Sequence, residues 1–434
     1  MVILEQTPAM IRIIIVFVFV LFLIRKKLSL GHSFIIGAVL LSFLFGLHPK
    51  PMIVSMAKSI VFPKTLSLAL IVSLILVLSS SMELSGQMKR LLKNFRGLIT
   101  NIKINLIVFP ALIGLLPMPG GAVFSAPMVK DLGTQSELSG DKLSFINYWF
   151  RHIWEYWWPL YPGVLLATVL ADINILSFMA FMCPITILSL YFGYLPLKGM
   201  CGTLAKNPDP NPNSDVSVWP FFKEMTPILL VIIPGLGMGI LFSYLFPNLS
   251  VSKEIGLILA LFMSICWIWF TNTLSKNQIL KIVVNPQNLN MMYIVAAILI
   301  FKGILEDSHA VGAISDELLM LKVPLMLIAV ILPFLVGLIT GITIAFVGVT
   351  LPILIPLIHS FGQSDFMLQY VMLAIVCGFS GVLLSPLHLC LILSNEYFNT
   401  SMGAVYRHLW LLCICLMSSG VAYFLVSYWI LKII

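Results

Sequence analysis

Charged residues are scarce in this chain. Asp, Glu, Lys and Arg together make up 10% of its 434 residues, whereas they supply about a quarter of an ordinary soluble domain. A soluble globular protein of this size is therefore excluded, because too little charge is available for a surface in water. A Walker A motif is also missing, which argues against ATP-driven work by this chain alone.

Cysteine pairs are absent as well. The seven cysteines lie mostly inside apolar stretches, and they form neither a CxxC pair nor a Cys/His set at the spacing of a zinc site. We therefore expect small buried hydrophobic residues, no metal centre and no resident cofactor, with Na⁺ or H⁺ considered as a coupling ion. The net charge of +8 follows the membrane loops and does not indicate a nucleic-acid partner.

Long hydrophobic runs, in contrast, are plentiful. Hydrophobic residues make up 60% of the chain and fall into blocks of about 17–24 residues, the length that crosses roughly 30 Å of hydrocarbon. This pattern predicts an all-α polytopic protein in a lipid bilayer. The expected spans are 9–24, 30–46, 65–82, 141–171, 174–195, 226–246, 254–271, 288–306, 364–398 and 409–431, and those at 141–171 and 364–398 are broken helices.

Two further apolar stretches, 102–131 and 322–358, carry Gly and Pro at their centres and polar residues at their ends. Cytoplasmic loops retain Lys and Arg, so the basic residues constrain the orientation of each span. The bias persists along the chain only if both stretches are re-entrant hairpins, because full crossings would invert it. Both termini are then expected on the outer side of the membrane, which we take to be the cytoplasmic (inner) membrane of a prokaryote. A proline-kinked single span is the alternative for the first stretch.

The order of elements in residues 1–195 recurs with opposite orientation in residues 223–434, after a hydrophilic cytoplasmic linker at 196–222. Each half is expected to contain five transmembrane helices, a re-entrant hairpin and a broken helix. No significant residue identity links the halves, so the repeat is one of pattern. Two inverted-topology repeats are typical of secondary transporters, which give alternating access to one central site.

The hairpin tips are candidate binding segments, because non-helical backbone within a membrane needs partners from protein or a water-filled cavity. In "LPMPGGAVFSAP" the prolines stop the incoming helix, the glycines permit a tight turn and the exposed amides suit an anion. In "GLITGIT" the threonine hydroxyls suit a solute, and helix packing through small residues is the alternative. The substrate-binding candidates are Pro117, Pro119, Gly120, Gly121, Ser125, Thr340, Gly341, Thr343 and, from the second broken helix, Ser385.

The broken helices carry titratable side chains, which are expensive within a membrane and usually functional. Arg151 and Glu155 lie four residues apart, on one face of the helix that is expected to precede the first break. The ion-coupling candidates are Arg151, His152, Glu155 and His388. A structural ion pair, an interfacial aromatic belt with a snorkelling arginine, or a satisfied buried histidine are the alternatives.

The paired hairpins and broken helices resemble the ion transporter superfamily. More narrowly, "LPMPGGAVFSAPM", "NYWFRHIWEYWWPLYPG" and "SPLHLCLILSNEYF" resemble the DUF401 family of prokaryotic membrane proteins. The superfamily resemblance implies transport of small solutes, many of them organic anions, in exchange for ions, and implies a homodimer. The dicarboxylate branch places Ser-Asn-Thr at both hairpin tips. That motif is absent here, which argues against a dicarboxylate substrate and against the sodium sites of that branch.

The sequence thus favours a secondary active transporter, or permease, that moves a small anionic organic solute and is coupled to a proton or sodium gradient. The alternatives are a passive channel or a membrane subunit of a larger export complex. An intramembrane enzyme is disfavoured, because Gly378-Phe379-Ser380-Gly381 lacks the GxSxG spacing and His152-Ile153-Trp154-Glu155 lacks the second histidine of HExxH.

Overall fold

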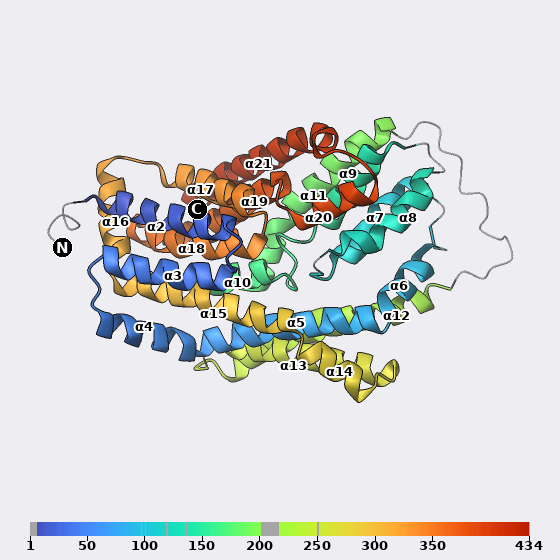
Figure 1. Cartoon of the computed structure of the whole chain (residues 1–434), viewed down its shortest axis with the longest axis horizontal. Helices are drawn as coiled ribbons and strands as arrows, with labels where there is room; N and C mark the ends of the chain where they lie inside the picture. Colours follow the sequence, from blue (N-terminus) through green and yellow to red (C-terminus); the bar gives the residue numbers. More distant parts are fainter. Residues whose placement is uncertain are drawn as a thin grey trace.

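The computed structural model describes residues 7–96, 98–99, 101–118, 120–134, 138–200, 217–249 and 251–433. These residues form α-helices and one short 3-10 helix, with no strand among them (Figure 1). In the first half of the chain the helices are α2 (Ala9–Arg25), α3 (Leu30–Leu44), α4 (Pro49–Val61), α5 (Pro63–Leu84), α6 (Gln87–Arg96), α7 (Ile102–Gly114), α8 (Ala122–Thr134), α9 (Gly140–Arg151), α10 (Pro162–Leu170) and α11 (Ile175–Met200).

The second half of the chain is helical as well. Its members are α12 (Trp219–Leu245), α13 (Ser252–Thr271), α14 (Lys276–Val283), α15 (Pro286–Asp307), α16 (Ala310–Met320), α17 (Leu325–Thr340), α18 (Thr343–Ser360), α19 (Met367–Leu384), α20 (Leu389–Tyr397) and α21 (Met402–Ile433). The 3-10 helix, Ser364–Phe366, precedes α19.

Within the described residues, eight helices are long and apolar enough to cross a membrane, judged by length and composition. They are Pro63–Leu84, Ile175–Lys198, Trp219–Leu245, Ser252–Thr271, Lys276–Asp307, Thr343–Ser360, Ser364–Tyr397 and Met402–Ile433. A ninth would be the pair α16 and α17, which is bent by 119° at its junction. The expected spans at 9–24 and 30–46 correspond to the shorter helices α2 and α3, with 17 and 15 residues. The prediction of an all-helical, multi-pass membrane protein is confirmed at this level.

The helices pack in two groups. In one group α2 packs on α3, α12 on α13, and α5 and α15 join them through the pairs α3–α15, α5–α13 and α5–α15. The other group contains α7 to α11 and α17 to α21. Figure 1 shows α4, α5, α13 and α14 along the lower edge and α9 and α21 along the upper edge. The groups meet where α5 contacts α10, α15 contacts α18 and α2 contacts α17.

Four helices of the second group are interrupted, and the breaks separate α7 from α8, α9 from α10, α17 from α18 and α19 from α20. The local sequence explains three of the breaks and the start of the helix that follows the fourth. Pro117 follows the end of α7, and Pro162 opens α10 at a position where a missing N–H costs nothing. Gly341 ends α17 in a left-handed conformation with φ of 65°, and Pro386 follows the end of α19.

The structure corrects the expected course of the chain in three places. The first broken helix ends at Arg151, so Glu155 lies inside the break rather than on the helix. The aromatic residues after Arg151 turn away from the helix axis, and the Trp154 indole donates a hydrogen bond to the Ala111 carbonyl of α7. Two segments outside the expected spans, Pro49–Val61 and Ala310–Met320, form helices α4 and α16. Helices α11 and α12 extend into the expected linker, of which residues 201–216 lie outside the described residues.

Candidate functional site

All four helix breaks line one cavity of about 310 Å³. This volume is at the lower end of the range of roughly 300–1,000 Å³ that is typical of small-molecule sites. The cavity lies between the two halves of the chain, and Leu76 of α5 and Met291 of α15 close it from the other helix group. The lining residues from the breaks are Pro117, Met118, Gly120, Arg151, Glu155, Tyr161, Pro162, Gly163, Gly341, Ile342, Thr343, Ile344, Leu387, His388, Leu389 and Cys390.

The guanidinium of Arg151 is the central charged group of this cavity. The residue is 3% exposed, at the end of α9. Its Nη2 donates a 2.7 Å hydrogen bond to the Met118 carbonyl, and its Nη1 lies 3.4 Å from the Cys390 sulfur. The Nε has no hydrogen-bond partner. A buried positive charge without a counter-charge is costly, and an anionic ligand in the cavity would lower that cost.

Two glycines allow the guanidinium and its backbone to approach the first hairpin. A Cβ at Gly121 would lie 2.3 Å from Nη2 of Arg151, and a Cβ at Gly114 would lie 2.0 Å from the Arg151 carbonyl oxygen. Both distances are far below van der Waals contact. Gly121 therefore makes room for the charged group, and Gly114 sets the spacing of α7 and α9. The sequence prediction names Gly121 but not Gly114.

Glu155 links the first break to the second half. Its Oε1 accepts a 2.5 Å hydrogen bond from the Thr343 hydroxyl at the start of α18, and its Oε2 lies 3.6 Å from Nε2 of His152. The carboxylate is 14% exposed. The sequence-based pairing of Arg151 with Glu155 rested on a continuous helix, and the carboxylate instead bonds to a hydroxyl of the opposite half.

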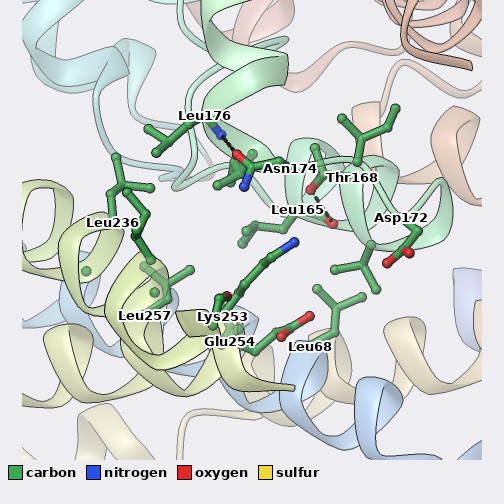
Figure 2. A pocket seen from close by; sticks show the side chains of 18 of the residues that line it. Leu68, Leu165, Thr168, Asp172, Asn174, Leu176, Leu236, Lys253, Glu254 and Leu257 are labelled. Carbon is green, nitrogen blue, oxygen red and sulfur yellow. Dashed lines mark hydrogen bonds between the residues drawn. The ribbon is translucent and has the colours of Figure 1, made fainter. Parts of the chain in front are cut away.

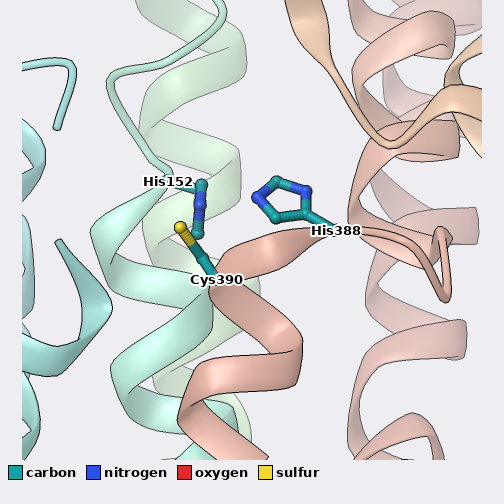
Figure 3. A group of neighbouring side chains, drawn as sticks. All are labelled: His152, His388 and Cys390. Atoms are coloured by element: carbon teal, nitrogen blue, oxygen red, sulfur yellow. The ribbon is translucent and has the colours of Figure 1, made fainter. Parts of the chain in front are cut away.

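The two imidazoles of the breaks contact each other beside Cys390 (Figure 3). The rings of His152 and His388 are 4.8 Å apart between centroids and nearly perpendicular, at 87°. Nδ1 of His152 is 2.6 Å from the Tyr148 carbonyl, and Nδ1 of His388 is 3.3 Å from the Val382 carbonyl. Carbonyl oxygens only accept, so each Nδ1 carries the proton and each neutral ring keeps a lone pair on Nε2.

The remaining sequence candidates divide into lining and supporting residues. Pro117, Gly120 and Gly341 line the cavity. The Thr340 hydroxyl donates to the Val336 carbonyl within α17, and the Ser385 hydroxyl accepts the Leu387 N–H within the second break. The Ser125 hydroxyl donates to Asn147 at 2.6 Å. These three hydroxyls stabilise the walls, and Pro119 lies outside the described residues.

Several residues of the site carry too little sequence signal to have been chosen. Asn147 on α9 donates to the Ala122 carbonyl and to the Ser394 hydroxyl of α20. Ser144 donates to the side-chain oxygen of Asn395, also on α20. This buried network joins the first hairpin, the first broken helix and the second broken helix. The signal that could have identified these residues is the presence of polar side chains in a span of otherwise apolar residues.

A second pocket of about 210 Å³ lies between α5, the α10–α11 turn, α12 and α13 (Figure 2). Lys64 and Asp172 form a 2.8 Å ion pair at this pocket. The hydrogen bond from the Lys64 ammonium holds the pKa of Asp172 below its ordinary value. Asp172 is exposed and its charge is paired, so this pocket offers a solute less than the cavity at the four breaks.

Comparison with known proteins places the chain in a family. The model of the family described as "Protein of unknown function (DUF401)" matches residues 9–426, and the chain therefore belongs to this family. A search of curated proteins finds no match.

Proposed function

We propose that this member of the DUF401 family is a secondary active transporter that carries a small organic anion by alternating access. One observation carries the proposal: the four helix breaks surround a single cavity, and a buried guanidinium with an unpartnered Nε lies in its wall. Interrupted helices at membrane depth are found where they line a binding cavity.

The charge of the cavity favours an anion. Helices α8, α10, α18 and α20 all begin at the breaks, and the N-terminus of a helix carries about half a positive charge with free N–H donors. Arg151 adds a full positive charge, and Glu155, whose Oε1 accepts a hydrogen bond from Thr343, adds a negative charge beside His152. An anion can therefore be bound by the guanidinium and by backbone donors together. This balance supports a carboxylate or a similar oxyanion.

An inverted repeat is part of the proposal. Contacts of the first half recur when ten is added to each helix number: α2–α3 with α12–α13, α7–α9 with α17–α19, and α8–α9 with α18–α19. Between the halves, α10 contacts α18 as α20 contacts α8. The turns match as well, since Gly120 and Gly341 have φ of 71° and 65° and Asp172 and Asn399 have φ of 52° and 51°. These correspondences support two repeats of five spans, with α7–α8 and α17–α18 as re-entrant hairpins.

The proposed transport cycle uses the weak attachment between the two helix groups. Few contacts join the group that holds the cavity to α5 and α15, so that group can shift as a body between two orientations. His152, His388 and Glu155 are the candidates for proton coupling, because an imidazole changes charge near physiological pH. Na⁺ is the alternative coupling ion. We further propose a homodimer of the ion transporter superfamily in a prokaryotic cytoplasmic membrane, with both termini outside.

Transport by purified protein in liposomes tests the function. Labelled monocarboxylates, sugar acids and dicarboxylates are offered with an imposed pH gradient, with a sodium gradient and with none. We expect uphill accumulation of one anion class under one gradient only. Passive flux that is independent of any gradient would favour the channel alternative. If no anion is accumulated and none raises the apparent melting temperature of the protein, the proposal is wrong.

A further inference from the structure

Three potential metal ligands from the two halves of the chain converge at the wall of the cavity (Figure 3). A ring nitrogen of His152, a ring nitrogen of His388 and the sulfur of Cys390 lie within 4.8 Å of one another. All three residues are buried, with exposed fractions of 1%, 6% and 6%. His152 follows α9, whereas His388 and Cys390 lie where α20 begins, so neither half contains the cluster alone.

The histidines are oriented as metal-binding histidines usually are. In such sites one ring nitrogen donates to a carbonyl or carboxylate, which fixes the ring and leaves the other nitrogen free for the metal. Here Nδ1 of each ring faces a backbone carbonyl, of Tyr148 for His152 and of Val382 for His388. Their Nε2 atoms are therefore available as ligands.

Glu155 supplies a fourth donor. Its Oε2 is 3.6 Å from Nε2 of His152, close to the separation of roughly 3.5 Å between two ligands of a tetrahedral zinc site. The two imidazoles and the thiol lie within 4.8 Å of one another, so they must approach by at most about 1.3 Å to reach that separation.

The donor set determines the class of ion. Two imidazoles, one thiolate and one carboxylate select a borderline or soft divalent cation, whereas Mg²⁺ and Ca²⁺ prefer oxygen ligands. Arg151 is the competitor, because its Nη1 lies 3.4 Å from both the Cys390 sulfur and Nε2 of His152. Metal entry requires Nη1 to withdraw, while Nη2 can remain on the Met118 carbonyl.

We propose that His152, His388, Cys390 and Glu155 form a site for a divalent cation of the zinc class. The thiol loses its proton on binding, and the bound ion joins the first broken helix to the second. Bound metal therefore holds the two halves in the arrangement described here. The site is independent of the proposed transport function, because binding is defined without any solute or gradient.

Cobalt titration of the purified full-length protein tests the site. Co²⁺ is a spectroscopic substitute for Zn²⁺, and a thiolate ligand adds a sulfur-to-cobalt charge-transfer band in the near ultraviolet. We expect one equivalent to bind, with this band and tetrahedral visible bands, and Zn²⁺ to displace it. Cys390→Ser should abolish the charge-transfer band. His388→Gln should weaken binding by at least about 100-fold, because loss of even a supporting group around a metal costs 10- to 100-fold.

Cys377→Ser is the matched control, since Cys377 is also buried, with 0% exposure, but lies within α19 away from the cluster. This variant should bind cobalt as the wild type does. The proposal is overturned if wild-type protein shows no sulfur-to-cobalt band, or if Cys377→Ser loses the band while Cys390→Ser keeps it. If Cys390→Ser does not fold, unchanged affinity in both His152→Gln and His388→Gln would overturn it equally.

Discussion

The two broken helices occupy matching places in their halves but carry different chemistry. The first break spans residues 152–161 and is flanked by Arg151, with Glu155 inside it. The second spans residues 385–388, and its sequence Ser-Pro-Leu-His has no acidic, Lys or Arg side chain. The break in the first half thus supplies charge, whereas the break in the second half supplies a short turn with an imidazole.

This difference separates the residues that shape the cavity from those that we expect to select the ligand. Where the halves agree, as in the glycine turns at the hairpin tips, the residues shape the cavity. Where they differ, as at Arg151 and its counterpart Leu384 at the end of α19, the residues determine what is bound. Variants that make one half resemble the other therefore separate the two roles.

Removing the charge of the first break should have the largest effect. Arg151→Gln is expected to lower gradient-driven anion uptake by about 100-fold or more, because a buried charge that binds an opposite charge contributes about 2–5 kcal/mol. Uptake into liposomes is the measurement. Arg151→Lys should recover part of the activity, since the charge returns without the planar fork.

Arg90→Gln is the control for loss of an arginine elsewhere. Arg90 lies on α6 and pairs with Glu224, away from the cavity. Its replacement should leave the anion affinity unchanged. An Arg151→Gln protein that folds and transports as well as the wild type would contradict the assignment of charge to the first break.

Replacement of Gly114 or Gly337, which allow similar close helix contacts in the two halves, should destabilise the protein to a similar extent. A Cβ at Gly114 would lie 2.0 Å from the Arg151 carbonyl oxygen, and a Cβ at Gly337 would lie 2.1 Å from the Gly378 carbonyl oxygen. Each change to Ala forces two helix backbones apart, at a cost of about 1–3 kcal/mol in the free energy of unfolding. The apparent melting temperature should fall similarly for Gly114→Ala and Gly337→Ala.

Gly312→Ala provides the comparison for this pair, because no atom lies within 4 Å of a Cβ at Gly312 in α16. It should be neutral or slightly stabilising, since Ala favours a helix by about 1 kcal/mol. A large loss at one of the paired glycines and none at the other would show that the helix contacts of the two halves are not equivalent.

The smallest effect is expected at the α10–α11 turn. Asp172→Asn installs the residue type found at Asn399 in the corresponding turn, where φ is nearly the same. Folding lowers the pKa of Asp172 through the Lys64 hydrogen bond, so the carboxylate stabilises the folded protein above its ordinary pKa of about 4. This stabilisation is lost as the pH falls through the lower folded value.

The difference in melting temperature between wild type and Asp172→Asn should therefore be present at pH 7 and shrink at a pH below the ordinary pKa of about 4. It should correspond to less than about 1 kcal/mol, because Asp172 is largely exposed and the pair is screened. An equal difference at both pH values would indicate that the turn geometry, rather than the charge, is responsible.

The sequence predicts the framework better than the site. Proline and glycine act locally, so the breaks after α7, α17 and α19 could be found from composition alone. The end of α9 could not, because it depends on the contact of Trp154 with α7. Because Glu155 lies in the break and not on α9, its spacing from Arg151 did not identify its partner. The sequence paired the carboxylate with Arg151 of the first half, whereas it accepts a hydrogen bond from Thr343 of the second half.

The parts of the site that the sequence could not predict depend on contacts between residues far apart in the chain. Arg151 and Cys390 are 239 positions apart, and Asn147 and Ser394 are 247 apart. No local pattern specifies such pairs, since they form only when the two halves pack together. Cysteine spacing could not indicate the proposed metal site for the same reason, because the proposed ligands come from opposite halves of the chain.

Each half contributes a short helix that packs on the other half, and this packing has a consequence for biosynthesis. Because α10 packs on α18 and α8 packs on α20, the walls of the cavity are incomplete until α20 has left the ribosome. Until then Arg151 lacks the Cys390 contact, and Asn147 lacks the contact with Ser394. During synthesis, the first half therefore lacks hydrogen-bond partners for some of its polar groups. We expect the final assembly of the cavity to occur only after the last fifth of the chain has been synthesised.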